Sequence, residues 1–146
     1  SGVDPVSRRK FWDLIYDMAD AGVTTLVTSH YLDEDEFCDQ LALLYQGRLI
    51  ALGTPQELKE TIAGEILAIY PDRLDEAFEV MRSLPAVTMV AIFGNCLHVA
   101  TSNPEEAQVM VREALEARQI SIRRLAQVAP TLEDAFIAMI SRVRGT

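Results

Sequence analysis

His30 stands where a histidine could do chemistry. It follows the β-branched run VTTLVT at residues 23–28, which is apolar enough to form an interior strand of a parallel sheet. In open α/β sheets, the residues just beyond the carboxyl ends of strands gather around the ligand. Position alone nevertheless favours a solvent-facing or capping loop histidine, so both interpretations stay open at this point.

Four consecutive acids at positions 33–36 follow His30 and raise the question of a metal site. Neighbouring residues on a helix are turned by about 100° from one another, so at most two of these carboxylates could face one ion. Acids are favoured in the first turn by the helix dipole. We therefore expect no metal site and interpret the acids as a solvated helix start. Ser29 is not expected to be a nucleophile activated by His30, because adjacent side chains on an extended segment point apart.

The other histidine and the two cysteines suggest no catalytic constellation. His98 lies in CLHVAT (96–101), where strand alternation predicts a surface or partly covered side chain on the face away from the core. No cysteine or acid stands at ligand spacing from it. Cys38 and Cys96 have no CxxC spacing, which fits a reducing cytosol, although the sequence leaves a disulfide open.

Residues 1–62 must position His30, and they predict an incomplete α/β unit. Caps and apolar spacing predict a helix that begins at Pro5 and stops at Gly22, a strand at 23–28 and a helix at 33–39. A hairpin follows, with strands at 41–45 and 48–52 around a Gln46-Gly47 turn. A Thr54/Glu57 capping box then begins a helix from 55 to about 63. The strand at 23–28 has no other strand to pair with. We interpret this unit as the end of a larger domain, in an excised fragment. We expect it to be partly disordered alone or to self-associate through that edge.

Residues 63–146 predict a second, complete unit, with the domain boundary near 62–65. The expected elements are strands at 65–70, 87–93, 96–101 and 120–128, a helix capped by Asp72, a helix after Asn103, and a final helix opened by Thr131 with Asp134. The order βαββαβ followed by a helix is typical of an α+β ferredoxin-like domain, an antiparallel sheet with helices on one face.

Charge and hydropathy exclude two classes of partner. The 146 residues contain 13 basic and 22 acidic side chains, for a net charge of −9. Non-specific nucleic-acid binding depends on clustered Lys and Arg, so we expect no nucleic-acid partner. No stretch approaches the roughly 20 apolar residues that span a bilayer, so we expect no direct membrane insertion.

Several segments together resemble the ATP-binding cassette (ABC) ATPases. SGVDP at 1–5 resembles their D-loop, TLVTSH at 25–30 their strand and switch histidine, and LALLYQGRLIALGTPQEL at 41–58 the segment that follows that histidine. PTLEDAF at 130–136 resembles the P-[ST]-L-E-D-x-F segment that closes the ATP-binding subunits of a class of ABC exporters. In those subunits an accessory α+β domain follows the ATPase core.

The resemblance implies roles for four residues. His30 would be catalytic: it would contact the γ-phosphate of ATP and help to hold the attacking water or sense the nucleotide state. Ser1, Gly2 and Asp4 would belong to the D-loop, which meets the opposite subunit of a nucleotide-sandwich dimer. For Asp4, helix capping alone explains an aspartate before proline equally well.

The resemblance also implies ATP and Mg²⁺ as cofactors of the parent ATPase. Its partners would be a second ATP-binding subunit and transmembrane permease subunits, and it would drive export from the cytoplasmic, inner face of the cell membrane. The 146 residues contain no G-x-x-x-x-G-K-[ST] phosphate loop, glutamine loop, LSGGQ-type signature or strand with the metal-binding Asp and catalytic Glu. We therefore expect the chain alone neither to bind nor to hydrolyse ATP.

Alternatively, residues 63–146 act without catalysis, as an interaction module or as a sensor of a small effector. The lack of paired acid–base groups counts against a third interpretation, an independent ferredoxin-like enzyme.

Overall fold

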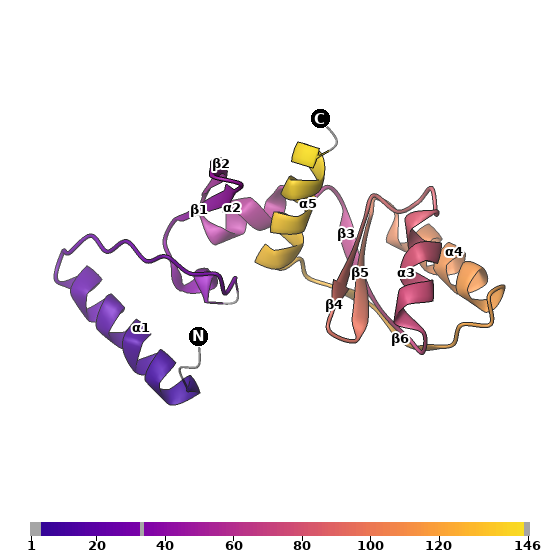
Figure 1. Ribbon diagram of the computed structural model, residues 1–146, viewed down its shortest axis with the longest axis horizontal. Helices are drawn as coiled ribbons and strands as arrows, with labels where there is room; N and C mark the ends of the chain where they lie inside the picture. Colours follow the sequence, from indigo (N-terminus) through magenta and orange to yellow (C-terminus); the bar gives the residue numbers. More distant parts are fainter. Residues whose placement is uncertain (1–3, 33, 145–146) are drawn as a thin grey trace. The chain divides into compact units, whose positions relative to one another are not determined.

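The chain divides into two compact units, Ser1–Phe37 and Cys38–Thr146 (Figure 1). The computed structural model describes residues 4–32 and 34–144. The expected boundary between an ATPase part (1–62) and an accessory part (63–146) stays a prediction, because the second compact unit includes residues on both sides of it.

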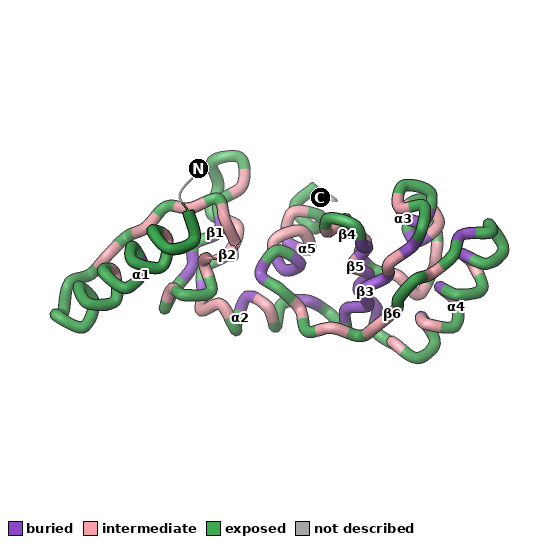
Figure 2. The backbone as a smooth tube through the Cα atoms, turned by 90° about the horizontal axis from the view of Figure 1, so that it is seen from below, coloured by how far each residue is buried: buried purple, intermediate pink, exposed green. Residues whose placement is uncertain are grey.

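The first unit consists of one long helix followed by a mostly irregular segment. Helix α1 (Pro5–Asp20) begins at Asp4 and ends where Gly22 takes up a positive φ of 84°, as the sequence predicts. Figure 2 shows that α1 is exposed along most of its length; its buried residue is Trp12. Trp12 packs against Phe37, with ring centroids 5.7 Å apart, and the Tyr16 hydroxyl donates to the Phe37 carbonyl. These contacts join the two ends of the unit.

Two elements predicted for the first unit are not formed. Residues 23–28 are not a strand, and the described part of this unit offers no other strand to form a ladder with them. High β propensity does not produce a strand without a hydrogen-bonded neighbour. The helix predicted at 33–39 reduces to the single 3₁₀ turn η1 (Asp35–Phe37). A short, acid-rich segment has too little apolar surface to stabilise a helix by packing.

The second unit begins with a hairpin and a short helix, both predicted. Strands β1 (Leu41–Tyr45) and β2 (Arg48–Gly53) pair antiparallel. Gln46 and Gly47 both have positive φ, which is the backbone of a tight hairpin turn. Helix α2 (Pro55–Glu60) starts with the predicted capping box, in which Thr54 and Glu57 exchange side-chain to backbone hydrogen bonds of 2.8 and 3.2 Å.

A four-stranded antiparallel sheet forms the centre of the second unit. Its strands are β3 (Glu65–Pro71), β4 (Met89–Phe93), β5 (Cys96–Thr101) and β6 (Ile122–Val128), in the order β4-β5-β3-β6. The helices are α3 (Leu74–Arg82), α4 (Pro104–Glu116) and α5 (Leu132–Arg144). The structure is therefore a mixed α and β fold with antiparallel sheets. Among the described residues, no helix combines the length and apolar character needed to cross a membrane.

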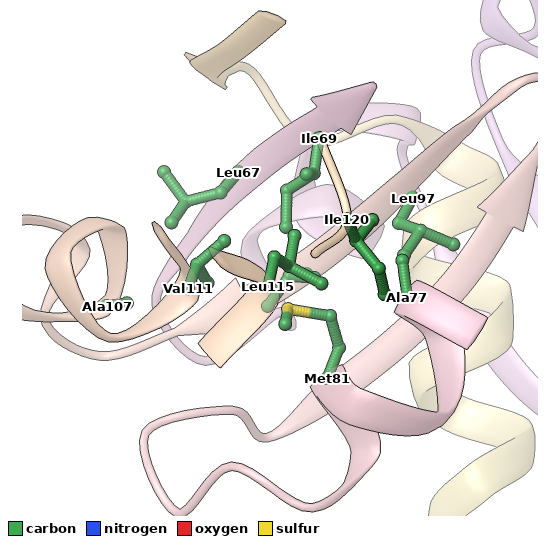
Figure 3. Packing of buried hydrophobic residues seen from close by; sticks show 10 residues of the cluster. Leu67, Ile69, Ala77, Met81, Leu97, Ala107, Val111, Leu115 and Ile120 are labelled. Carbon is green, nitrogen blue, oxygen red and sulfur yellow. The ribbon is translucent and has the colours of Figure 1, made fainter. Parts of the chain in front are cut away.

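Helices α3 and α4 cover one face of this sheet. Figure 3 shows their apolar side chains meeting those of β3 and β5, and the buried cluster comprises Leu67, Ile69, Ala77, Met81, Leu97, Val99, Ala107, Val111, Leu115 and Ile120. Alternate residues of a strand point to opposite faces. Ile66 and Ala68, which are also buried, therefore belong to the other face.

Helix α5 covers that other face, so helices lie on both sides of the sheet and not on one side as predicted (Figure 1). Its buried residues include Leu132, Ala135 and Met139. The predicted one-sided arrangement is correct for α3 and α4. It fails for α5 because the apolar stripe of this helix needs a surface to cover, and the alternate residues of β3 and β5 provide one.

The predicted cap of α3 is also wrong. The Asp72 carboxylate accepts a hydrogen bond from the Ser121 amide at 3.0 Å and does not cap the helix. The N-cap is Arg73, which makes no side-chain capping bond. Its guanidinium group donates instead to the carbonyls of Arg118 and Gln119, both at 2.8 Å. Both side chains thus bind a connection 45 to 49 residues away, which local sequence does not reveal.

Candidate functional site

Asp4 forms the start of α1 and is the only predicted D-loop residue among those that the structure describes. Its Oδ1 accepts hydrogen bonds from the amides of Val6 (2.9 Å) and Ser7 (3.0 Å), and its Oδ2 accepts one from the Ser7 hydroxyl (2.7 Å). These bonds, the one from the Ser7 hydroxyl first, hold the pKa of the Asp4 carboxyl below its ordinary value. The capping role is therefore confirmed. Ser1 and Gly2 lie outside the described residues.

His30 is exposed in a bend that its two neighbours shape. The Ser29 hydroxyl accepts a hydrogen bond from the Tyr31 amide at 2.9 Å, which turns the chain across the histidine. The imidazole packs against the Tyr31 ring, with centroids 4.1 Å apart and planes 35° apart. An exposed imidazole held on an aromatic ring can reach a ligand without first being uncovered.

Arg8 of α1 contacts the segment that follows His30. Its Nε lies 2.6 Å from Oε1 of Glu34, whose side chain is only 14% exposed. Its guanidinium carbon lies 5.3 Å from the centroid of the Tyr31 ring. The interpretation of the acids as a solvated helix start is therefore wrong for Glu34, because this carboxylate is paired and largely covered. The pairing residue is about 26 positions earlier, so no local pattern indicates it.

The described residues fit one contact of a nucleotide site and not a complete site. Among residues 4–32 and 34–144, no group of three or more His, Cys, Asp or Glu side chains could hold a metal ion. His30 could meet a phosphate, but the glycine-rich loop that would surround the phosphates is not part of the sequence. We therefore derive no ATP hydrolysis step from these residues alone.

The sequence did not predict the pair that His98 forms with Asp134. The Nδ1 atom of His98 lies 2.9 and 3.1 Å from the two carboxylate oxygens, across the face of the sheet that α5 covers. The His98 side chain is 12% exposed and that of Asp134 is fully buried. The imidazole also stacks on Phe93, with centroids 4.2 Å apart. The expectation of a partly covered histidine on the face away from the α3 and α4 core is confirmed, but its pairing with an acid was not foreseen.

Asp134 also closes the start of α5. Its Oδ2 accepts hydrogen bonds from the amide (2.9 Å) and the hydroxyl (2.8 Å) of Thr131, and its own amide donates to that hydroxyl. Burial alone would raise the pKa of Asp134, but the bonds from His98 and Thr131 outweigh it, so the pKa lies below its ordinary value. The carboxylate is thus ionised and accepts, which places a proton on Nδ1 of His98.

We interpret this pair as structural and not as an active site, because it joins the start of α5 to β5. Two hollows of the second unit, of about 270 and 260 Å³, both adjoin Thr88, Met89 and Ser141. Neither His98 nor Asp134 lines them. One signal in the sequence could have indicated the pair: an acid beside the apolar stripe of a helix, three positions after a threonine cap, is placed to turn inward.

Comparisons with known proteins agree with the resemblance noted in the sequence. The family of ATP-binding protein DrrA1-3-like C-terminal domains matches residues 53–140. The daunorubicin/doxorubicin resistance ATP-binding protein DrrA of Streptomyces peucetius is 31% identical over 144 residues, covering 95% of this chain and 43% of that protein. The linearmycin resistance ATP-binding protein LnrL of Bacillus subtilis is 32% identical over 146 residues, covering 97% and 47%.

A third relative matches a shorter region at higher identity. The probable multidrug ABC transporter ATP-binding protein YbhF of Escherichia coli is 52% identical over 65 residues, which are 44% of this chain and 11% of that protein. The chain spans less than half the length of each of these three relatives.

Proposed function

Because the chain belongs to the family of DrrA1-3-like ATP-binding proteins of ABC transporters, in their C-terminal part, we propose that it works as part of an ATP-binding subunit that couples ATP binding and hydrolysis to export. The observation that carries this proposal is the match to DrrA and LnrL over 95–97% of the chain. At that coverage the match includes the segment around His30 and the sheet of the second unit.

In this proposal His30 contacts the γ-phosphate of ATP in the complete subunit. Its exposure and its ring contact with Tyr31 support the role, because the imidazole is accessible and oriented. A donor held in place before the reaction stabilises charge on the phosphoryl oxygens at little reorganisation cost. Ser1, Gly2 and Asp4 form the D-loop that meets a second ATP-binding subunit. ATP and Mg²⁺ are bound largely by residues outside these 146.

Unsatisfied groups in the first unit support its being part of a larger domain. Among the described residues, Trp12 Nε1 and Thr25 Oγ1 are buried without a hydrogen-bond partner, whereas buried polar groups normally have one. Leu26, within the expected strand at 23–28, is 94% exposed. Neighbouring strands of an ATPase core would pair with 23–28 and cover this leucine.

Residues 63–146 would then be an accessory domain attached to that core. We propose a ferredoxin-like arrangement for residues 63–146, supported by the order βαββαβ and by the antiparallel order β4-β5-β3-β6. Permease subunits in the cell membrane and a second ATP-binding subunit are the proposed partners, at the cytoplasmic face. The names of DrrA, LnrL and YbhF, which concern drug resistance and multidrug transport, agree with export.

A hybrid subunit tests this function. In it, the 146 residues replace the segment of DrrA from Streptomyces peucetius that aligns with them. We expect the purified hybrid to bind MgATP and to hydrolyse it, and the isolated 146-residue chain to show no MgATP binding by calorimetry. A folded hybrid that binds MgATP but does not turn it over, or a chain that binds MgATP alone with micromolar affinity, would contradict the proposal.

A further inference from the structure

Arg8 is placed to control the orientation of His30 although it does not touch the imidazole in the contacts described above. It reaches the histidine loop at two points, the carboxylate of Glu34 and the face of the Tyr31 ring. Tyr31 in turn carries the imidazole on its ring. A guanidinium group is suited to both contacts at once, because it is planar, always charged and able to stack on an aromatic face.

The structure around His30 makes the two contacts of Arg8 important for the position of this loop. Residues 23–28, which lead into His30, form no strand in this unit, and a ladder that they form in the complete subunit would end before Ser29 and would not hold the imidazole itself. Among the described contacts, the Ser29 turn fixes the backbone before Tyr31, and Arg8 holds the loop from α1. The Arg8 side chain is 36% exposed and that of Glu34 is 14% exposed. Partial burial makes this ion pair more stable than one in which both groups are fully exposed to solvent.

We propose that Arg8 is a positioning residue for His30, acting through Tyr31 and Glu34. This rests on the proposed function, in which His30 meets the γ-phosphate. When Arg8 loses its charge, Glu34 loses its partner and Tyr31 loses the cation that fixes its ring. The imidazole then samples more orientations, which lowers the fraction of subunits in which it is aligned for phosphoryl transfer.

A first experiment tests the contact in the 146-residue chain without nucleotide. The ring resonances of His30 and the ring-to-ring NOEs between His30 and Tyr31 are recorded for the parent chain and for Arg8→Gln. Arg9→Gln is the matched control, because Arg9 is exposed on the same helix and carries the same charge. We expect Arg8→Gln to shift the His30 resonances and weaken the NOEs, and Arg9→Gln to change neither. The indole resonance of Trp12, which is buried in the same unit against Phe37, reports that the first unit remains folded in both variants. Unchanged His30 signals in Arg8→Gln would overturn the proposal.

A second experiment measures ATP hydrolysis in the hybrid subunit. We expect Arg8→Gln to lower kcat roughly 10- to 100-fold with little change in KM, since misplacement of a reacting group costs rate more than binding. We expect Arg8→Lys, which keeps the charge, to recover part of the rate. In a His30→Ala background, Arg8→Gln should cause no further loss, because residues that act through one another are not additive.

The outcomes separate the two claims. If His30→Ala leaves kcat unchanged, the proposed function of His30 fails. If His30→Ala lowers kcat but Arg8→Gln lowers it by the same factor with or without His30, Arg8 acts independently and the positioning role is refuted. Equal losses in Arg8→Gln and Arg9→Gln would likewise show a general charge effect on α1.

Discussion

We expect removal of the Asp134 carboxylate to lower the stability of the second unit. Asp134→Ala deletes a charge-assisted hydrogen bond with His98 and the hydrogen bonds that close the start of α5 on Thr131. A hydrogen bond to a charged group contributes about 1.5–3 kcal/mol, and loss of a helix cap costs about 0.5–2 kcal/mol. We therefore expect the free energy of unfolding of this unit to fall by roughly 2–5 kcal/mol.

Two further variants divide this loss between the pair and the cap. Thr131→Ala removes the cap and leaves the His98 contact, so we expect a loss of about 1 kcal/mol. His98→Ala leaves a fully buried carboxylate without the hydrogen bond from Nδ1 of His98, which is expected to cost about as much as Asp134→Ala. The double variant of His98 and Asp134 should then be less destabilised than the sum of the two single variants, since both delete the same interaction.

The pH dependence of the same pair has a definite sign. The pKa of Asp134 is lower in the folded chain than its ordinary value of 3.8. The stabilisation from its ionised form is therefore fully present above pH 3.8 and is lost as the pH falls through the lowered folded pKa. The stability difference between the parent chain and Asp134→Asn should therefore shrink below about pH 4.

The assay must report on the second unit by itself. The only tryptophan, Trp12, lies in the first unit, so its fluorescence would report on the wrong part. Amide exchange at Ile66–Ile69 in β3 under native conditions gives the local opening free energy instead, and urea unfolding by circular dichroism gives the overall change. Protection of β3 within 0.5 kcal/mol of the parent in Asp134→Ala, or strict additivity of the two single variants, would refute this account.

The other predictions concern backbone strain and packing in the second unit. Gly64 has a φ of 102°, and a Cβ there would collide with the Thr101 carbonyl oxygen, so Gly64→Ala should lower the melting temperature strongly and cost more than roughly 2 kcal/mol. Gly22→Ala, at positive φ but in open space, should cost only about 1–2 kcal/mol; equal effects would contradict the proposed clash. Leu115→Ala should cost roughly 2–5 kcal/mol in urea unfolding, because the side chain is fully buried. Val109→Ala on the exposed side of the same helix should stay within about 0.5 kcal/mol of the parent, and a similar loss in both variants would argue against the packing in Figure 3.

Features that depend on adjacent residues were predictable from the sequence. The Gln46-Gly47 turn places two residues with positive φ between apolar runs, and the Thr54/Glu57 capping box forms as its spacing indicates. The Asp4 cap likewise follows from an aspartate before a proline at the first helical position. In each case the partner groups are within a few positions, so the sequence contains the whole interaction.

Features that depend on distant partners were not predictable. The apolar run at 23–28 has strand propensity but no partner strand in its unit, so it does not become a strand. Asp72 serves the Ser121 amide and not its own helix, and His98 meets an acid 36 positions later. Strand alternation correctly separates His98 from the core that α3 and α4 cover. It could not reveal that α5 returns to cover the opposite face.

The candidate site likewise combines features that the sequence predicts with features that it does not predict. The capping by Asp4 was predicted and is confirmed, whereas the ion pair of Arg8 with Glu34 was not foreseen. Local sequence gives the acids at 33–36 the pattern of a charged helix start, and only the fold brings one of them against α1. The catalytic role of His30 stays a prediction that depends on the resemblance and on a complete nucleotide site.

ATP hydrolysis by the hybrid subunit under single-turnover conditions, with and without His30→Ala, tests the central claim most directly. The account predicts that the parent hybrid converts bound ATP to ADP. It also predicts that His30→Ala binds MgATP with similar affinity but lowers the hydrolysis rate by roughly 100-fold or more, as the loss of a preorganised group on the transferring phosphate requires. Hydrolysis at the parent rate by a folded His30→Ala hybrid would contradict it.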